Sequence, residues 1–279
     1  MLIGLLAALV AALLYGVAAV MQASASRGLP PIEEGVLRLT RTALTTPVLV
    51  ASILMLVVGA GLHLVAIGRV PLYLAQAGIA AQLPITALVS AVTLKERLTG
   101  RDVLAVASTF LGIALLAADA GESGATQDRP LLIVGLYVAT ALMLGLGTVA
   151  YRGSGRAAGA SLGLLAGLGY AVVTLGGRQL AAPYLSWRTL VIAVVVVIAG
   201  VCAFWLYSFA MQRISVAAAS APLIIGETLV PALVGVVVLG DGVPSWPAIA
   251  AGLVLAMAGA IYLAGFEGRV LDRGRPDGV

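Results

Sequence analysis

Long runs of apolar residues alternate with short polar segments along the whole chain. A membrane-spanning helix needs about 20 consecutive, mostly apolar residues, and nine windows of the sequence meet this requirement. They cover residues 2–24, 43–67, 71–93, 103–118, 131–151, 157–180, 189–211, 216–239 and 247–266. The pattern therefore predicts an all-α polytopic membrane protein with nine transmembrane helices, of which 103–118 is the shortest.

The composition supports this class. Hydrophobic residues make up 61% of the 279 positions and charged residues only 10%, whereas a soluble domain carries about 25% charged residues. This excludes a soluble enzyme and a nucleic-acid-binding domain. Cys202 is the single cysteine, which excludes an intrachain disulfide. The chain is apolar from Leu2 onward without a basic stretch before it, so we expect no cleavable signal peptide.

The basic residues test the number of spans, because cytoplasmic loops carry an excess of lysine and arginine. With nine spans, the 16 basic residues divide 12 against 4 between alternate loops. The larger set comprises Arg27, Arg38, Arg41, Lys95, Arg97, Arg101, Arg152, Arg156, Arg213, Arg269, Arg273 and Arg275; the smaller comprises Arg69, Arg129, Arg178 and Arg188. The division predicts a multi-pass protein of the cell (plasma or inner) membrane, with its N-terminus outside and its C-terminus in the cytoplasm.

Three longer polar segments lie between or after the predicted spans. Residues 27–42 are too charged to cross a membrane and are expected to form a cytoplasmic connector. Residues 119–129 are expected to form a linker on the outer side. Residues 267–279 are charged and glycine-rich, which predicts a disordered cytoplasmic tail.

The first four and last four spans resemble two copies of one unit. "GLLAAL" at Gly4 is repeated as "GLLAGL" at Gly163, "AIGR" as "AMQR", and "VTLKE" as "VVLGD", all in the same order. We therefore expect two membrane repeats, 1–118 and 157–266, joined by the segment 119–156 that contains the fifth span. Because the single fifth span lies between the two four-span repeats, the second repeat enters the membrane from the opposite side. Such inverted repeats are found in many secondary transporters.

The third helix of each repeat, followed by an acidic turn, resembles the drug/metabolite transporter superfamily. The matching segments read "VPLYLAQAGIAAQLPITALVSAVTLKERLTGRD" and "SVAAASAPLIIGETLVPALVGVVVLGD". The nine-helix layout is most similar to its EamA-like and magnesium-transporter-like branches. The magnesium branch typically has an acidic residue and an asparagine in its second helix, where this chain has Ala60 and His63. A divalent cation site needs several oxygen ligands, so this difference argues against magnesium transport.

Glu227 is predicted to be the most informative residue, because it is the only acidic or basic residue well inside any predicted span. A charge at that depth costs about 2.5–3.5 kcal/mol on insertion scales, so it should face a cavity, meet a partner or stay protonated. Gln82 is its counterpart in the first repeat, at an offset of 145 residues. Pro84 and Pro231 follow these two residues and indicate either paired broken helices around one site or two packing kinks.

Further candidates for a substrate site are polar or aromatic residues within or near the spans. They are Gln76, Gln22, Tyr15, Tyr207 and His63. His63 is the only histidine, and we interpret it as an interfacial or packing residue in preference to a proton relay.

The resemblance implies a permease that moves a small metabolite or an amphipathic molecule by alternating access, with proton coupling or passive exchange both open. One alternative is a flippase for a lipid-linked sugar or another lipid. A second is a structural membrane subunit that transports nothing. We expect no enzymatic activity, no cofactor, no metal and no nucleic-acid partner, and a homodimer is compatible with the sequence.

Overall fold

The computed structural model describes residues 1–26, 45–93, 95, 97–124, 130–180, 186–211, 213–214 and 216–272. The predicted connector 27–42 and residues 273–279 of the predicted tail lie outside these ranges. The side chain of Gln22 also lies outside the described part, as do the side chains of residues 266–272.

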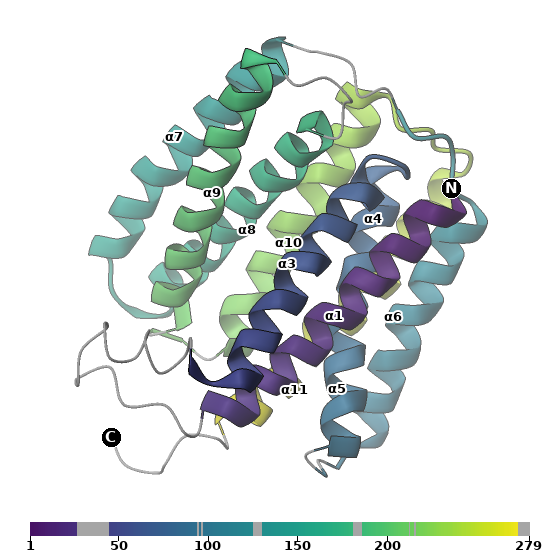
Figure 1. The fold of residues 1–279 in the computed structure, drawn as a ribbon, viewed down its shortest axis with the longest axis vertical. Helices are drawn as coiled ribbons and strands as arrows, with labels where there is room; N and C mark the ends of the chain where they lie inside the picture. Colours follow the sequence, from purple (N-terminus) through teal and green to yellow (C-terminus); the bar gives the residue numbers. More distant parts are fainter. Residues whose placement is uncertain are drawn as a thin grey trace.

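The described chain is a bundle of long helices (Figure 1). In chain order they are α1 (Leu2–Ser26), α3 (Pro47–Ile67), α4 (Leu72–Ala80), α5 (Gln82–Thr93), α6 (Gly100–Ala118), α7 (Pro130–Arg152), α8 (Gly155–Leu180), α9 (Trp187–Met211), α10 (Val216–Val234), the π-helix η2 (Gly235–Leu239) and α11 (Trp246–Asp272). Within the described residues, nine helical segments are long and apolar enough to cross a membrane, with α4 and α5 counted as one and α10 and η2 as another. The predicted all-α architecture, with nine helical segments able to span a membrane, is confirmed for the described residues.

Local sequence explains where several helices begin. Pro47 occupies the first turn of α3, a position where its missing N–H is not needed. The shortest predicted span, 103–118, begins earlier than expected because Thr99 and Asp102 form a reciprocal capping box at the start of α6. The expected disorder after Phe266 is wrong for residues 267–272, which continue α11; helical hydrogen bonding needs no apolar side chains.

The two spans that carry central prolines differ from each other. The first is interrupted at Ala81, between α4 and α5, and Pro84 lacks the N–H that would bond the Ala80 carbonyl. In the second, α10 runs through Pro222 and Pro231 and changes to a π-helix only at Gly235. The structure therefore shows one interrupted helix and one π-helical switch instead of two matching breaks.

The helices pack in two groups that meet in the middle of the bundle. In one group α1 packs on α3, α4 and α5; in the other α8 packs on α7, α9 and α10. The groups are joined where α6 packs on α11 and where α4 packs on α10. Gly112 allows α6 and α11 to pack closely, because it has no side chain. A Cβ at this position would lie 2.5 Å from the backbone nitrogen of Ala256.

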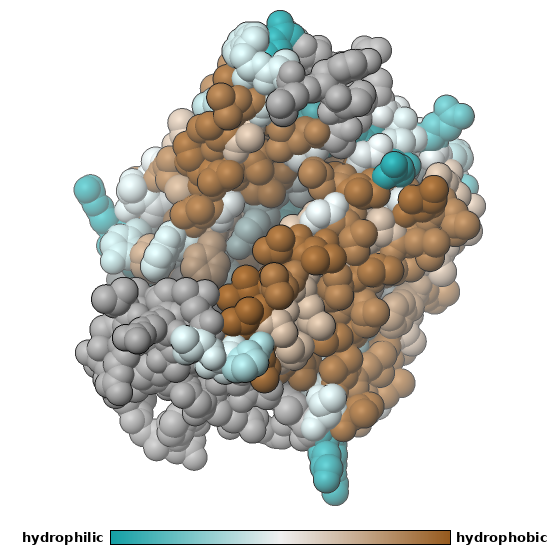
Figure 2. Space-filling view, viewed as in Figure 1, coloured by the Kyte–Doolittle hydropathy of each residue, from teal (hydrophilic) through white to brown (hydrophobic). Residues whose placement is uncertain are grey.

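The outer surface of the bundle is apolar. Figure 2 shows hydrophobic residues over the sides of the molecule, with hydrophilic residues gathered toward its two ends. Side chains such as Val57, Leu131, Val197 and Val254 are more than half exposed, as a lipid-facing surface requires. The same view is hollowed between α3 and α9, and paler, less hydrophobic atoms lie at the bottom of the hollow.

Candidate functional site

Arg178 lies in the last turn of α8 and is completely buried. Its guanidinium donates to the carbonyl oxygens of Ile67 and, at 2.7 Å, Val70 in the turn between α3 and α4. It also donates to the Ser123 hydroxyl and, at 2.8 Å, to the Gly124 carbonyl in the loop after α6. Arginine suits this role because it offers five donors in a fixed fork.

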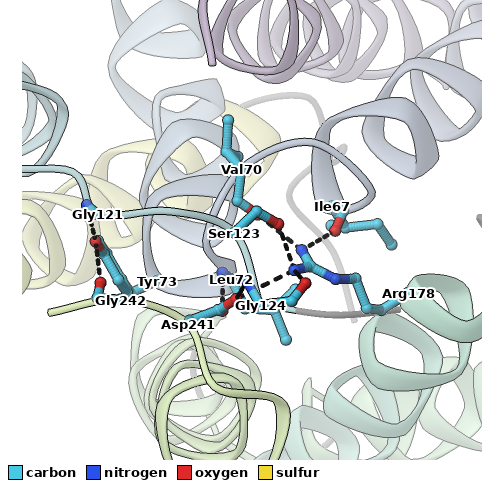
Figure 3. Close-up of polar contacts among 10 residues, drawn as sticks. All are labelled: Ile67, Val70, Leu72, Tyr73, Gly121, Ser123, Gly124, Arg178, Asp241 and Gly242. Carbon is cyan, nitrogen blue, oxygen red and sulfur yellow. Dashed lines mark hydrogen bonds and ion pairs between the residues drawn. The ribbon is translucent and has the colours of Figure 1, made fainter. Parts of the chain in front are cut away.

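Asp241 supplies the opposite charge (Figure 3). It follows η2 and Gly240, whose positive φ of 77° ends the π-helix. One carboxylate oxygen of Asp241 lies 3.1 Å from the Arg178 guanidinium and accepts the Gly124 N–H at 2.7 Å. The other oxygen accepts the Leu72 N–H, also at 2.7 Å, at the start of α4. The carboxylate is thus bonded to three different segments.

We name these seven residues the Arg178 cluster. They are Ile67, Val70, Leu72, Ser123, Gly124, Arg178 and Asp241. A second set of bonds lies beside them: the Tyr73 hydroxyl donates to the Gly242 carbonyl and accepts the Gly121 N–H, both at 3.0 Å. Together these contacts join four segments at one end of the bundle.

The energetic consequence of the cluster follows from its burial. Removing one partner of a buried ion pair leaves an uncompensated charge and costs about 3–5 kcal/mol, although the intact pair contributes little net stability. The remaining donors of Arg178 are also used, except its Nε, which has no hydrogen-bond partner in the described chain. The cluster therefore constrains geometry more than it stabilises the fold.

Sequence reasoning missed this cluster. Arg178 was expected among the basic residues of the outer loops, and Asp241 was expected as part of the acidic turn that follows the eighth span. Arg178 and Asp241 both lie at the end of a predicted span, where apolar residues give way to polar ones. From the sequence alone, each therefore resembles an ordinary charged residue of a loop. The available signal was that two opposite charges end two predicted spans on the same side of the membrane.

A second polar layer lies deeper in the bundle, on Gln76. This side chain is buried on α4, and its amide nitrogen donates to the Thr174 hydroxyl on α8 at 2.7 Å. The same nitrogen donates to the backbone carbonyl of Glu227 on α10 at 3.1 Å. Pro231, four residues after Glu227, has no N–H to fill that carbonyl. Gln76 therefore replaces the hydrogen bond that Pro231 removes, and it links three helices.

The Glu227 side chain takes no part in this link, which uses only its backbone carbonyl. It is half-buried, and within the described residues its carboxylate accepts no hydrogen bond and forms no ion pair. Tyr170 on α8 lies within electrostatic range of the carboxylate and of Tyr207 on α9. The Tyr207 hydroxyl in turn lies 2.5 Å from the Ser220 hydroxyl. Polar side chains of α8, α9 and α10 thus follow one another from Glu227 toward the end opposite the Arg178 cluster.

The structure brings together three of the predicted site residues: Gln76 and Glu227 directly, and Tyr207 through Tyr170. Gln82 is half-buried at the start of α5, and its carbonyl faces Gly16 of α1. Tyr15 packs on Gly59 at the α1–α3 contact. His63 is half-buried on α3, and its Nδ1 is buried with no hydrogen-bond partner among the described residues. No hydrogen bond in the described chain connects these last three residues with Glu227.

An apolar groove runs along α8 between α7 and α10. Its volume is about 580 Å³. The lining consists of Leu131, Leu132, Gly135, Leu136, Ala139, Leu142, Met143, Leu146, Leu165, Leu168, Ala171, Val172, Leu175, Val230, Val234 and Val238. None of these side chains is polar, and three of them lie on the α10–η2 segment that also carries Glu227. The groove is suited to an alkyl chain and to no charged group.

Comparison with known proteins yields no match among family models, curated proteins or solved structures.

Proposed function

We propose that this chain is a membrane carrier of the drug/metabolite transporter type, which moves an amphipathic small molecule by alternating access. The observation that carries the proposal is a correspondence between the packing of its two halves. The α1–α3 contact corresponds to α8–α9, and the packing of α1 on α4 and α5 corresponds to that of α8 on α10. The pairs α6–α11 and α4–α10 then join equivalent helices of the two halves.

The direction of the helices supports an inverted relation between the halves. Met1, Arg69, Glu122 and Gly242 line one shallow depression, so α1 begins at that end of the bundle. Arg178 contacts the same loops from the last turn of α8, so α8 ends there. Inverted repeats place the substrate site near mid-depth at the interface between them. Gln76 and Glu227 lie at the contact between the halves, because α4 packs on α10, and Glu227 is near the middle of the apolar segment Ala218–Leu239, which supports a substrate site beside it.

The apolar groove favours an amphipathic substrate. A hydrophilic solute needs an enclosed polar path, whereas a molecule with an alkyl chain can enter sideways from the lipid. A groove without polar side chains on α7, α8 and α10 fits the second case. The same observation favours one further candidate, a flippase that passes a lipid headgroup along the polar residues while the acyl chain stays in the groove.

A pair of matched variants tests the groove. Gly135 and Gly145 both lie on α7, both are exposed, and a Cβ on either would meet nothing within 4 Å. Only Gly135 belongs to the groove lining. We expect Gly135→Phe to fill the groove and slow the transbilayer movement of a fluorescent phospholipid by more than about tenfold, which corresponds to about 1.4 kcal/mol of barrier. Gly145→Phe should behave as wild type.

The measurement uses purified protein in liposomes and dithionite quenching of the labelled lipid. A wild-type rate equal to that of protein-free liposomes would exclude lipid flipping and leave the soluble amphipath as the substrate class. Equal slowing by both phenylalanines would show that the groove is not the path.

Topology is tested with single cysteines in a Cys202→Ala background. Glu122 lies at the end of the bundle that carries the N-terminus, and the exposed Arg97 lies in the turn between α5 and α6, one span away along the chain. We expect Glu122→Cys to react with an impermeant maleimide in whole cells and Arg97→Cys to react only after lysis, because basic residues favour the cytoplasmic side. Glu122 is preferred to Gly124, where a Cβ would lie 2.2 Å from the Leu239 carbonyl oxygen. The reverse labelling pattern would contradict the assigned orientation.

A further inference from the structure

The Arg178 cluster joins segments from both halves of the protein at one end (Figure 3). Ile67, Val70 and Leu72 belong to the first half, and Arg178 and Asp241 belong to the second. Ser123 and Gly124 come from the segment between the halves. The hydrogen bonds that the Arg178 guanidinium donates would be lost if these segments moved apart.

Two of the membrane-spanning segments that reach the cluster, α4–α5 and α10–η2, are irregular below it. The Leu72 end of α4 is separated from α5 by the interruption at Ala81. Asp241 follows the π-helix Gly235–Leu239, and π-helical turns occur frequently at functional sites. Chain interruptions of this kind allow the outer part of a helix to move while its inner part stays packed.

The cluster is closed, yet it lies next to water. Ser123, which accepts a hydrogen bond from Arg178, also lines the shallow surface depression at this end, together with Arg69 and Glu122. If the segments separated, water entering through this depression would replace the hydrogen bonds of Arg178 and Asp241. A buried charged pair at this position therefore has two satisfied arrangements, one closed and dry and one open and hydrated.

We propose that the Arg178 cluster is the gate of this end of the carrier. In the structure the gate is closed, and it opens when α4 and the η2–α11 loop move away from the end of α8. Gln76, which joins α4, α8 and α10 below the gate, marks the depth at which the moving parts stay connected. This inference rests on the proposed carrier function, but its test requires no substrate.

Distances between paired spin labels at each end test the gate in purified protein in lipid nanodiscs. One pair, Glu122→Cys with Trp187→Cys, reports on the end that carries the cluster. The other, Arg97→Cys with Arg156→Cys, reports on the opposite end. All four positions are exposed, and Cys202 is replaced by alanine in every sample.

Two substitutions weaken the gate to different degrees. Asp241→Asn removes the charge that faces Arg178 while keeping one acceptor oxygen. Arg178→Lys keeps the charge, but a single ammonium cannot reach the carbonyls, the hydroxyl and the carboxylate together. We expect Asp241→Asn to add a population with a longer distance at the cluster end and a shorter distance at the opposite end. Arg178→Lys should give the same two changes with a smaller population.

The reciprocal change at the far end separates a gate from a local structural bond. Broadening at the cluster end alone, with an unchanged Arg97–Arg156 distribution in both variants, would overturn the proposal. Unchanged distributions at both ends would overturn it as well. If Asp241→Asn fails to fold, the Arg178→Lys distributions decide the question by the same criteria. If the distances at the two ends shift in opposite directions but the protein transports no substrate, the proposed function is refuted. The cluster would then be a conformational switch in a protein that is not a carrier.

Discussion

Arg178→Met is expected to lower the free energy of unfolding by about 3–5 kcal/mol, because it leaves the Asp241 carboxylate buried without its counter-ion. Methionine is apolar and replaces the aliphatic stem of the arginine, so the expected loss comes mainly from the missing guanidinium. The change also frees the carbonyls of Ile67, Val70 and Gly124, each of which accepts from Arg178 in the wild type. Unfolding by denaturant or heat in a mild detergent, followed by tryptophan fluorescence, measures the effect.

Arg69→Met provides the matched control for this prediction. Arg69 lies at the same end of the bundle but is exposed, and surface charges contribute about 0–1 kcal/mol. The double variant Arg178→Met/Asp241→Asn should be more stable than Arg178→Met alone, because it removes the uncompensated charge and its amide oxygen still accepts from one of the two N–H groups, Leu72 or Gly124, that the carboxylate binds. Equal stability of Arg178→Met and Arg69→Met would contradict a buried ion pair.

The helices were largely predictable from the sequence, because a window of apolar residues long enough to cross a membrane depends little on tertiary contacts. The discrepancies arise where local chemistry replaces hydropathy. The capping box of Thr99 and Asp102 begins α6 before its apolar run begins, and α11 continues to Asp272 after its apolar run has ended. The π-helix at Gly235 has no hydropathy signature, since its residues are as apolar as the helix before it.

The candidate site was predictable only in part. Glu227 and Gln76 could be identified because polar residues are rare within the spans. Pro231 could also indicate that the Glu227 carbonyl lacks its helical donor. The partner of that carbonyl could not be foreseen, because Gln76 is 151 residues away and reaches it only through the packing of α4 on α10. For the same reason the 63-residue separation of Arg178 and Asp241 concealed their pairing.

Glu227→Gln is expected to reduce transport by more than about tenfold while the protein still folds, which corresponds to about 1.4 kcal/mol of lost binding or coupling energy. The substitution keeps the size of the side chain and removes its ionisation. It leaves the backbone carbonyl, and therefore the hydrogen bond from Gln76, in place. Because the carboxylate has no hydrogen-bond partner among the described residues, its replacement breaks no hydrogen bond there and removes an ionisable group from within an apolar span. Stability should be unchanged or higher.

Ser220→Ala gives a comparison within the same row of polar residues. It removes the hydrogen bond between the Ser220 and Tyr207 hydroxyls. This bond lies near Tyr170 but involves no carboxyl group. If charge on Glu227 drives transport, Ser220→Ala should retain most of the activity that Glu227→Gln loses. Glu227→Asp should retain part of it, because the charge is kept but withdrawn by one methylene.

The assay uses purified protein reconstituted into liposomes. It measures the uptake of one cationic and one anionic amphipathic probe under an imposed proton gradient. A carboxylate that binds a cationic headgroup predicts that Glu227→Gln loses the cationic probe at every proton gradient. A carboxylate that carries the coupled proton predicts that the variant still exchanges the probe but no longer concentrates it. Full concentrative uptake by Glu227→Gln would refute both roles, and the Gln76–Thr174 link and Tyr207 would then be the residues to test for substrate contact.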